Sequence, residues 1–177
     1  EVYQLLDKVR TNRGALNLNL PEKTIIFNKK NWPVDVKKVY GMTSNKIIEE
    51  FMVLANVAAA EEINKSSQNT VYRVHEQPSE EKYKTLIDMI GQPLASILIG
   101  KLPHPSLMNK ILEQTKETAD YELINQSILR SQSQARYDNK NYSHFGLALK
   151  NYVHFTSPIR RYADLLIHRQ IRIKKIF

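Results

Sequence analysis

The chain has 177 residues, enough for one domain with a hydrophobic core. Its 26 Lys and Arg against 18 Asp and Glu give a net charge of +8, which favours a polyanionic partner, although a solvated basic surface is the alternative. The absence of cysteine excludes disulfides and thiolate metal sites, and no apolar run approaches the roughly 20 residues that a membrane span needs. We therefore expect a cytoplasmic protein with no membrane partner. Because there is no initiator Met and helical patterns reach both ends, we also expect a segment of a longer protein.

The first part of the chain, residues 1–43, is expected to form one helix and a small antiparallel meander. Apolar residues recur at helical spacing over residues 2–10, and Arg13-Gly14 ends that pattern. Three strand-like runs follow, at 16–20, 23–28 and 34–40.

The middle part, residues 44–136, is predicted to be mainly helical. A long helix at 44–65, capped by Ser44, carries apolar residues around more than one stripe, so we expect it to lie deep inside a larger domain. A polar loop at 64–70 follows this helix. The remaining elements are a strand at 71–74, a helix that begins after Ser79 and ends at Gly91, and helices at 107–116 and 121–136.

Two adjacent acids in the long helix are candidate site residues. Winding the helix at about 100° per residue places Glu49 on the less apolar side with Asn56, and Glu50 at the edge of the apolar stripe. A buried carboxylate needs a partner. Glu50 is predicted either to form a salt bridge with a core arginine or to face a ligand hydroxyl or a metal ion, and the residue pattern leaves both open.

The last part, residues 137–177, contains a basic motif after two short predicted strands at 144–149 and 152–155. A helix is predicted to start with Ser157 as its cap. Its first turn holds Arg160 and Arg161, although the partial positive charge of a helix N-terminus favours acids there. Two guanidinium groups beside free N–H groups make an anion site, and phosphate is the obvious anion.

Asp164 is the predicted brace of this anion site. It lies four residues after Arg160 and four before His168, within reach of both at helical spacing. We expect it to hold Arg160 in the fixed rotamer that a phosphate contact needs. The apolar side of the helix is predicted to carry Ile159, Tyr162, Ala163, Leu166 and Ile167. The opposite side is predicted to carry Arg161, Asp164, His168 and Arg172.

Other chemistries find little support in the residues. The chain has five glycines that do not cluster, so no loop is built to cradle phosphates. The six aspartates are scattered, whereas two-metal phosphoryl chemistry needs converging carboxylates. His75 is interpreted as a hydrogen-bonded structural residue. The residues alone indicate a basic α+β segment with an arginine-lined anion site.

The motif HFTSPIRRYADLLIHR, at 154–169, resembles the most recognisable motif of the catalytic (RNB) domain of the ribonuclease II / ribonuclease R family. Similar stretches occur in the same order at 13–22, 47–60, 74–78 and 144–149. The double arginine and the short spacing from HFGLAL favour the ribonuclease R branch. The resemblance covers nearly the whole chain and implies an α+β fold, predominantly helical here, in which small antiparallel strands pack with several long helices.

The resemblance implies a processive 3′-to-5′ exoribonuclease that hydrolyses single-stranded RNA to nucleoside 5′-monophosphates. In that family an aspartate cluster in the upstream half of the domain holds Mg²⁺, and OB-fold-type RNA-binding domains flank the catalytic domain. Neither the cluster nor these domains occur in residues 1–177, so we expect this C-terminal portion to hold no metal and to be inactive alone.

The resemblance also implies roles for individual residues. Arg160 matches an arginine on the scissile or terminal phosphate, and Arg161 is a weaker substrate contact. Glu50, or its neighbour Glu49, matches an acid near the ribose of the 3′-terminal nucleotide. Supporting positions around the substrate contacts are Tyr162, Asp164, His168 and Arg169, with His144 and Phe145 matching without an implied role.

Two alternatives come from other functional classes. The chain is alternatively a non-catalytic single-stranded nucleic-acid-binding module whose arginines grip backbone phosphates, or a scaffold segment without a ligand. An aspartate cluster upstream of these residues would distinguish the hydrolase from the binding module.

Overall fold

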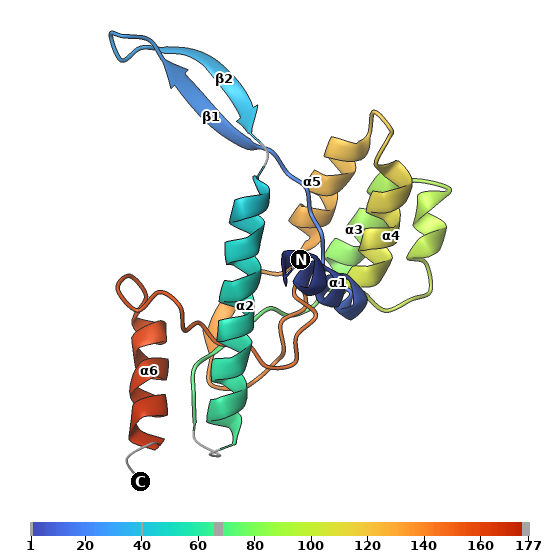
Figure 1. The fold of residues 1–177 in the computed structure, drawn as a ribbon. Helices are drawn as coiled ribbons and strands as arrows, with labels where there is room; N and C mark the ends of the chain where they lie inside the picture. The colour runs from blue at the N-terminus through green and yellow to red at the C-terminus, as the bar shows by residue number, and fades with distance from the viewer. Residues whose placement is uncertain (1, 40, 66–68, 175–177) are drawn as a thin grey trace.

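A computed structural model describes residues 2–39, 41–65 and 69–174 (Figure 1). The elements follow the order α1 (Val2–Arg13), β1 (Glu22–Phe27), β2 (Pro33–Val39), α2 (Thr43–Asn64), β3 (Tyr72–Val74), α3 (Glu80–Ile90), the 3-10 helix η1 (Leu94–Ile97), α4 (Pro105–Thr115), α5 (Tyr121–Ser131), β4 (Arg136–Asp138) and α6 (Tyr162–Lys174). Strands β1 and β2 form one antiparallel pair, and β3 and β4 form another. The predicted α+β class, mainly helical with small antiparallel sheets, is confirmed.

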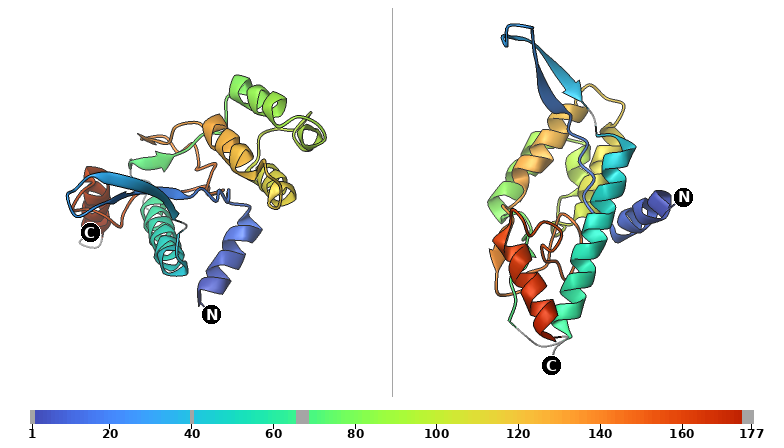
Figure 2. Two further views of the ribbon diagram at one scale, coloured as in Figure 1. Left: turned by 90° about the horizontal axis from the view of Figure 1, so that it is seen from above. Right: turned by 60° about the vertical axis from the view of Figure 1, so that its left-hand side comes forward.

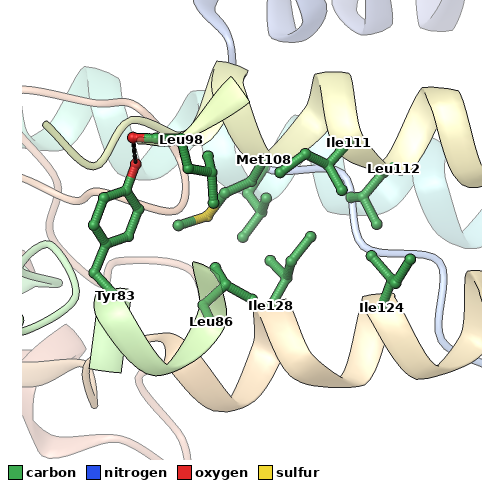
Figure 3. Close-up of a cluster of buried hydrophobic side chains, with 9 residues drawn as sticks. Tyr83, Leu86, Leu98, Met108, Ile111, Leu112, Ile124 and Ile128 are labelled. Atoms are coloured by element: carbon green, nitrogen blue, oxygen red, sulfur yellow. Dashed lines mark hydrogen bonds between the residues drawn. The ribbon is translucent and has the colours of Figure 1, made fainter. Parts of the chain in front are cut away.

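Helices α3, α4 and α5 pack around the larger of two hydrophobic clusters (Figure 3). Its centre is Met108, Ile111 and Ile128, which are fully buried. Each helix contributes one apolar stripe at the 3.6-residue period, so three helices enclose the cluster without a sheet. This part of the fold leaves the long helix α2 and the motif on the other side of the molecule (Figure 1).

The predicted ends of α3 are confirmed. The hydroxyl of Ser79 accepts a hydrogen bond from the backbone N–H of Lys82, and Gly91 ends the helix with a φ of 61°. By contrast, α5 ends at Ser131 and not at 136, because the chain turns there to form β4 beside β3. Ser44 does not cap α2, whose N-cap residue is Met42.

Helices α2 and α6 lie side by side and enclose a second, smaller cluster (Figures 1 and 2). Ala59 and Ala60 of α2 allow α6 to approach closely, and Ile167 and Val153 fill the space between them. Opposite this contact, α2 exposes Phe51, which is 45% accessible. The expected burial of α2 on most sides is therefore not seen among the described residues.

The β1–β2 hairpin projects beyond the helices (Figure 2), and all seven residues of β2 are exposed. At its base Lys38 forms a 2.7 Å ion pair with Glu122 of α5. The expected third strand of the meander, 16–20, is wrong. The backbone N–H of Leu16 donates to the Gly146 carbonyl, and those of Asn17 and Asn19 donate to the side chains of Asn109 and Asn125, so no strand ladder forms there.

The strands predicted at 144–149 and 152–155 are also wrong. The first contains only isolated bridges, from His144 to His75 and to Leu149, and the second has no strand. Their backbone groups bond to other loop residues, to Arg73 of β3 and to the side chain of Asn56 of α2, and these bonds replace a ladder. The predicted polar loop at 64–70 lies partly outside the described residues.

Candidate functional site

The segment 157–161, called here the arginine turn, precedes helix α6. The carbonyl of Ser157 accepts hydrogen bonds from the backbone N–H groups of Arg160, at 3.2 Å, and Arg161, at 3.1 Å. The first α-helical residue is Tyr162, so the predicted helix start at Ser157 is wrong. The carboxylate of Asp164 accepts a 2.8 Å hydrogen bond from the backbone N–H of Ser157. Residues 157–161 therefore form a turn, where the first turn of the helix was expected.

Asp164 braces Arg161 and not Arg160. Its Oδ2 accepts a 2.8 Å hydrogen bond from Nη2 of Arg161, and the carboxylate is completely buried. Burial raises the pKa of Asp164, but the bonds from Arg161 and from the Ser157 N–H outweigh it, so the net pKa is lowered. The predicted pairing of Asp164 with Arg160 is therefore wrong. Because the helix starts later than predicted, the arginine that reaches the carboxylate is Arg161, three residues before Asp164.

Three buried polar atoms beside this ion pair have no hydrogen-bond partner among the described residues: Thr156 Oγ1, Arg161 Nε and Asp164 Oδ1. A buried polar group without a hydrogen-bond partner lowers the stability of a folded protein. The arginine turn is thus held on its inner side by the Arg161–Asp164 ion pair, with these three enclosed polar atoms left without a partner among the described residues.

Arg160 is exposed, and within residues 2–39, 41–65 and 69–174 no carboxylate pairs with it. Its neighbour Ile159 is 98% exposed and Tyr162 is 66% exposed, so the first two residues of the predicted apolar side do not face the core. Ile167, which was predicted on the same side, does face the core. Arg160 is a free guanidinium on a rigid turn, which is what binding of an external anion requires.

His168 supports the motif loop from α6. Its Nε2 donates to the carbonyl of Phe155 at 2.9 Å, and its ring stacks on the Phe155 ring with centroids 4.0 Å apart. The expected approach of His168 to Asp164 is therefore wrong. Arg169, the next residue, is exposed on α6.

Asn56 of α2 fastens the same loop and was missed in the sequence. Its side chain is 2% exposed, donates to the Tyr152 hydroxyl at 3.0 Å and accepts from the backbone N–H of Phe155 at 2.8 Å. The predicted placement on the less apolar side of α2 is wrong, because Asn56 shares the buried face with Val53 and Ala60. The sequence signal for this was that Asn56 lies three residues after Val53 and four before Ala60, which places it on their face of the helix.

Glu50 is buried and forms a salt bridge with an arginine, which was one of the two predictions for this residue. Nη1 of Arg10 lies 2.6 Å from Glu50 and 3.1 Å from Glu49, whose side chain is 55% exposed. Burial lowers the pKa of Arg10, but hydrogen bonds to both glutamates outweigh it and the net pKa is raised. Arg10 comes from α1, 40 residues away, so helical periodicity alone did not reveal it.

This carboxylate pair lines a pocket of about 470 Å³ between α1, α2 and α4. Its other polar lining includes Asn17, Asn19 and Tyr121. Its charged lining consists of the Arg10 guanidinium, two lysines and four acids, and together with the asparagine amides these groups can bind a ligand that offers hydroxyl groups.

His75 is a structural residue in the sense predicted. Its Nδ1 accepts a hydrogen bond from the backbone N–H of Gly146 at 3.1 Å, and its ring meets His144 edge-on at 5.0 Å. Burial lowers the pKa of His144 to about 3, with the charges of His75 and Arg73 acting in the same direction. Both imidazoles are accordingly neutral at pH 7 and serve packing.

Within the part of the chain that the structure describes, no group of three or more His, Asp and Glu side chains could hold a metal ion. The residues present therefore do not fit a magnesium site of the kind that the resemblance implies. No helix in the same ranges is long and apolar enough to cross a membrane.

Comparison with known proteins gives a consistent result. The family model described as "RNB domain" matches residues 1–173. The chain is 42% identical over 172 residues to ribonuclease R of Vibrio cholerae and 38% identical over 177 residues to ribonuclease R 1 of Lactococcus lactis. In both cases the alignment covers 97% of this chain and 21% of the relative, so the chain spans about a fifth of their length.

Solved structures show the same likeness. The apo form of Mycoplasma genitalium RNase R matches with a TM-score of 0.84 and 30% identity, covering 96% of this chain and 27% of that one. The same protein matches in its complex with ribose-methylated single-stranded RNA. Yeast Ssd1, described as a pseudonuclease, matches with a TM-score of 0.61 and 27% identity over 72% of this chain.

Proposed function

Because the chain belongs to the RNB domain family, we propose that it is the C-terminal portion of the catalytic domain of a 3′-to-5′ exoribonuclease. The complete protein hydrolyses RNA processively to nucleoside 5′-monophosphates in the cytoplasm. This segment contacts single-stranded RNA near its 3′ end, and flanking RNA-binding domains and the rest of the catalytic domain are its partners within the longer chain. The likeness to RNase R structures with bound RNA supports this choice of substrate.

The observation that carries the proposal is the exposed Arg160, which has no carboxylate partner in the part of the chain that the structure describes, beside Arg161, which is paired with Asp164. Arg160 binds the phosphate at the reacting bond and stabilises the negative charge that develops there. Arg161 is already committed to Asp164, so it fixes the turn and adds positive potential. Tyr162, at 66% exposure, lies beside Arg160 where it borders the bound RNA.

The pocket around Arg10 supplies the proposed ribose site. Glu49 and Glu50 flank the guanidinium, and a carboxylate there accepts a hydrogen bond from a ribose 2′-OH, which distinguishes RNA from DNA. Glu49 is the more exposed of the two, whereas Glu50 orients Arg10. Replacing each by Gln and comparing affinity for RNA and DNA oligonucleotides of one sequence assigns the contact to one glutamate.

Metal chemistry belongs to residues outside this chain in the proposal. Mg²⁺ in the complete enzyme would be held by carboxylates that the described residues do not bring together. The chain alone is accordingly a binding and orienting unit without turnover.

A second candidate function is a non-catalytic RNA-binding module. The similarity to Ssd1, a protein described as a pseudonuclease, favours it. The two candidates differ in the rest of the protein. A natural full-length protein without hydrolytic activity in the presence of Mg²⁺ would establish the second.

The test is single-turnover hydrolysis by the full-length protein carrying Arg160→Ala. We expect the rate to fall by about 100-fold or more, the scale of losing one preorganised donor to a developing oxyanion. Lys84→Ala, which removes an exposed charge from α3, is the control and should leave the rate unchanged. Unchanged hydrolysis in Arg160→Ala would remove Arg160 from the reaction.

A further inference from the structure

The short β3–β4 pair carries an aromatic and cationic cluster next to the arginine turn. Arg73 of β3 lies directly opposite Tyr137 of β4 in the register, so the two side chains share one face of the pair. The Arg73 guanidinium lies over the Tyr137 ring, 5.0 Å from its centroid. Tyr137 is 42% exposed, so its ring is open to solvent beside the guanidinium.

This cluster is joined to the motif through His154. The Tyr137 hydroxyl and His154 Nδ1 share a 2.8 Å hydrogen bond, and their rings meet edge-on at 5.6 Å. His154 also packs edge-on against Tyr152, which Asn56 holds against α2. The ring of Tyr137 is therefore fixed by neighbours of the arginine turn, so it is a rigid aromatic surface.

Positive charge converges on the same place. Burial lowers the pKa of His154 to about 4, and the charges of Arg161, Arg73 and Arg160 act in the same direction. Among the described residues only Arg161 of these three has a carboxylate partner. Two guanidinium groups, from β3 and from the turn, thus remain available to one polyanion.

The opposite face of the β3–β4 pair behaves differently. Arg136, next to Tyr137, is paired with Glu76 at 2.6 Å and with Asp138 at 3.2 Å. Its charge is neutralised by two acids, and its guanidinium lies over the Tyr142 ring, 5.3 Å from the centroid. Among the described residues no carboxylate pairs with Arg73, whose guanidinium lies over the Tyr137 ring. Both faces therefore hold an arginine beside a tyrosine ring, but only on the face of Arg73 and Tyr137 is the arginine without a carboxylate partner among the described residues.

We propose that Tyr137 and Arg73 form a nucleotide subsite next to the arginine turn, in which the Tyr137 ring stacks on a base of single-stranded RNA and Arg73 binds an adjoining phosphate. Stacking platforms flanked by arginines bind single strands without reading sequence, because every base has a π face. The subsite continues the phosphate contact of Arg160 along the strand, and it rests on the proposed function. The subsite increases the affinity for RNA and fixes the register of the bound RNA strand, and it takes no part in bond cleavage.

The test uses equilibrium binding of a short oligouridylate to the chain and to its Tyr137→Leu variant. Leucine keeps an apolar body in the same place but offers no ring for stacking. We expect affinity to fall by roughly tenfold, the scale of losing one base–aromatic stack. Circular dichroism verifies that the variant is folded, and Tyr137→Phe, which keeps the ring, should retain most of the affinity.

Oligonucleotides with a single abasic site at successive positions separate stacking from a structural role. For the position that stacks on Tyr137, removal of the base should weaken binding to the unmodified chain and have little further effect on Tyr137→Leu. Equal losses in both proteins at every position would overturn the stacking assignment.

Arg73→Gln and Arg136→Gln form a matched pair on the two faces. Arg73→Gln should weaken oligouridylate binding by roughly tenfold, because it removes a charged phosphate contact, while Arg136→Gln should change it less than twofold. Equal effects of both variants would overturn the subsite. If Arg160→Ala abolishes binding but the Arg73 and Tyr137 variants do not weaken it, the subsite fails and the proposed function stands. If the chain does not bind the oligouridylate at all, both fail.

Discussion

Replacing Asp164 by Ala tests the structural basis of the arginine turn. The carboxylate is completely buried, and it holds both the Arg161 guanidinium, which is 19% exposed, and the backbone N–H of Ser157. Removing it leaves a largely buried positive charge without its partner and an N–H without an acceptor. Breaking a buried ion pair in this way costs about 3–5 kcal/mol of unfolding free energy. For a domain of this size, that corresponds to roughly 6–20 °C in Tm.

Urea unfolding followed by circular dichroism measures this loss. Asp88→Ala, which removes an exposed carboxylate from α3, should stay within about 0.5 kcal/mol of the unmodified chain. The lowered pKa of Asp164 adds a second signature, because a carboxylate with a depressed pKa stabilises the fold above its unfolded pKa and loses that contribution as pH falls through the folded pKa. The stability difference between unmodified chain and Asp164→Ala should therefore shrink in acid below about pH 4. An Asp164→Ala chain as stable as Asp88→Ala at pH 7 would refute the reasoning.

Three further predictions concern packing and pH. Gly146→Ala should lower the unfolding free energy by about 1–3 kcal/mol in urea titrations, because the new Cβ would lie 3.0 Å from Nδ1 of His75; a neutral result would mean that the loop shifts freely. Ile128→Ala should cost about 2–5 kcal/mol by the same measurement, since the side chain is fully buried, while its exposed neighbour Leu129→Ala should cost far less; similar losses would contradict the described core. Because burial lowers the pKa of His144 to about 3, the neutral ring stabilises the fold above pH 6.5 and that contribution is lost as pH falls toward the folded pKa. Between pH 7 and pH 5 the loss is about 2 kcal/mol, and His144→Gln should remove it from the pH dependence; an unchanged dependence would contradict the shift.

The helices were largely predictable from the sequence because their signals are local. In α3 the Ser79 cap, the two acids after it and Gly91 lie within one short segment, and each acts on its own neighbours. The β1–β2 hairpin was predictable for the same reason, since β-rich runs flank a polar turn. The strand expected at 16–20 failed because Asn109 and Asn125, from distant helices, supply acceptors that a local pattern cannot show.

The candidate site was predictable in composition but not in pairing. The motif identified Arg160, Arg161 and Asp164, yet a shift of the helix start exchanged the partner of Asp164 from Arg160 to Arg161. The arginine that pairs with Glu50 lies 40 residues away in α1, and its position depends on how α1 packs on α2. Such pairings are decided by tertiary packing, so the sequence supplied candidates and the fold selected among them.

The most direct test of the account is the salt dependence of single-stranded RNA binding by the chain with and without Arg160→Gln. We predict that the logarithm of the association constant falls linearly with the logarithm of salt concentration, and that Arg160→Gln reduces the slope by about 0.7, the value for one phosphate contact on a single strand. Binding that is insensitive to salt, or identical slopes for the two proteins, would contradict the claim that the arginine turn holds an RNA phosphate.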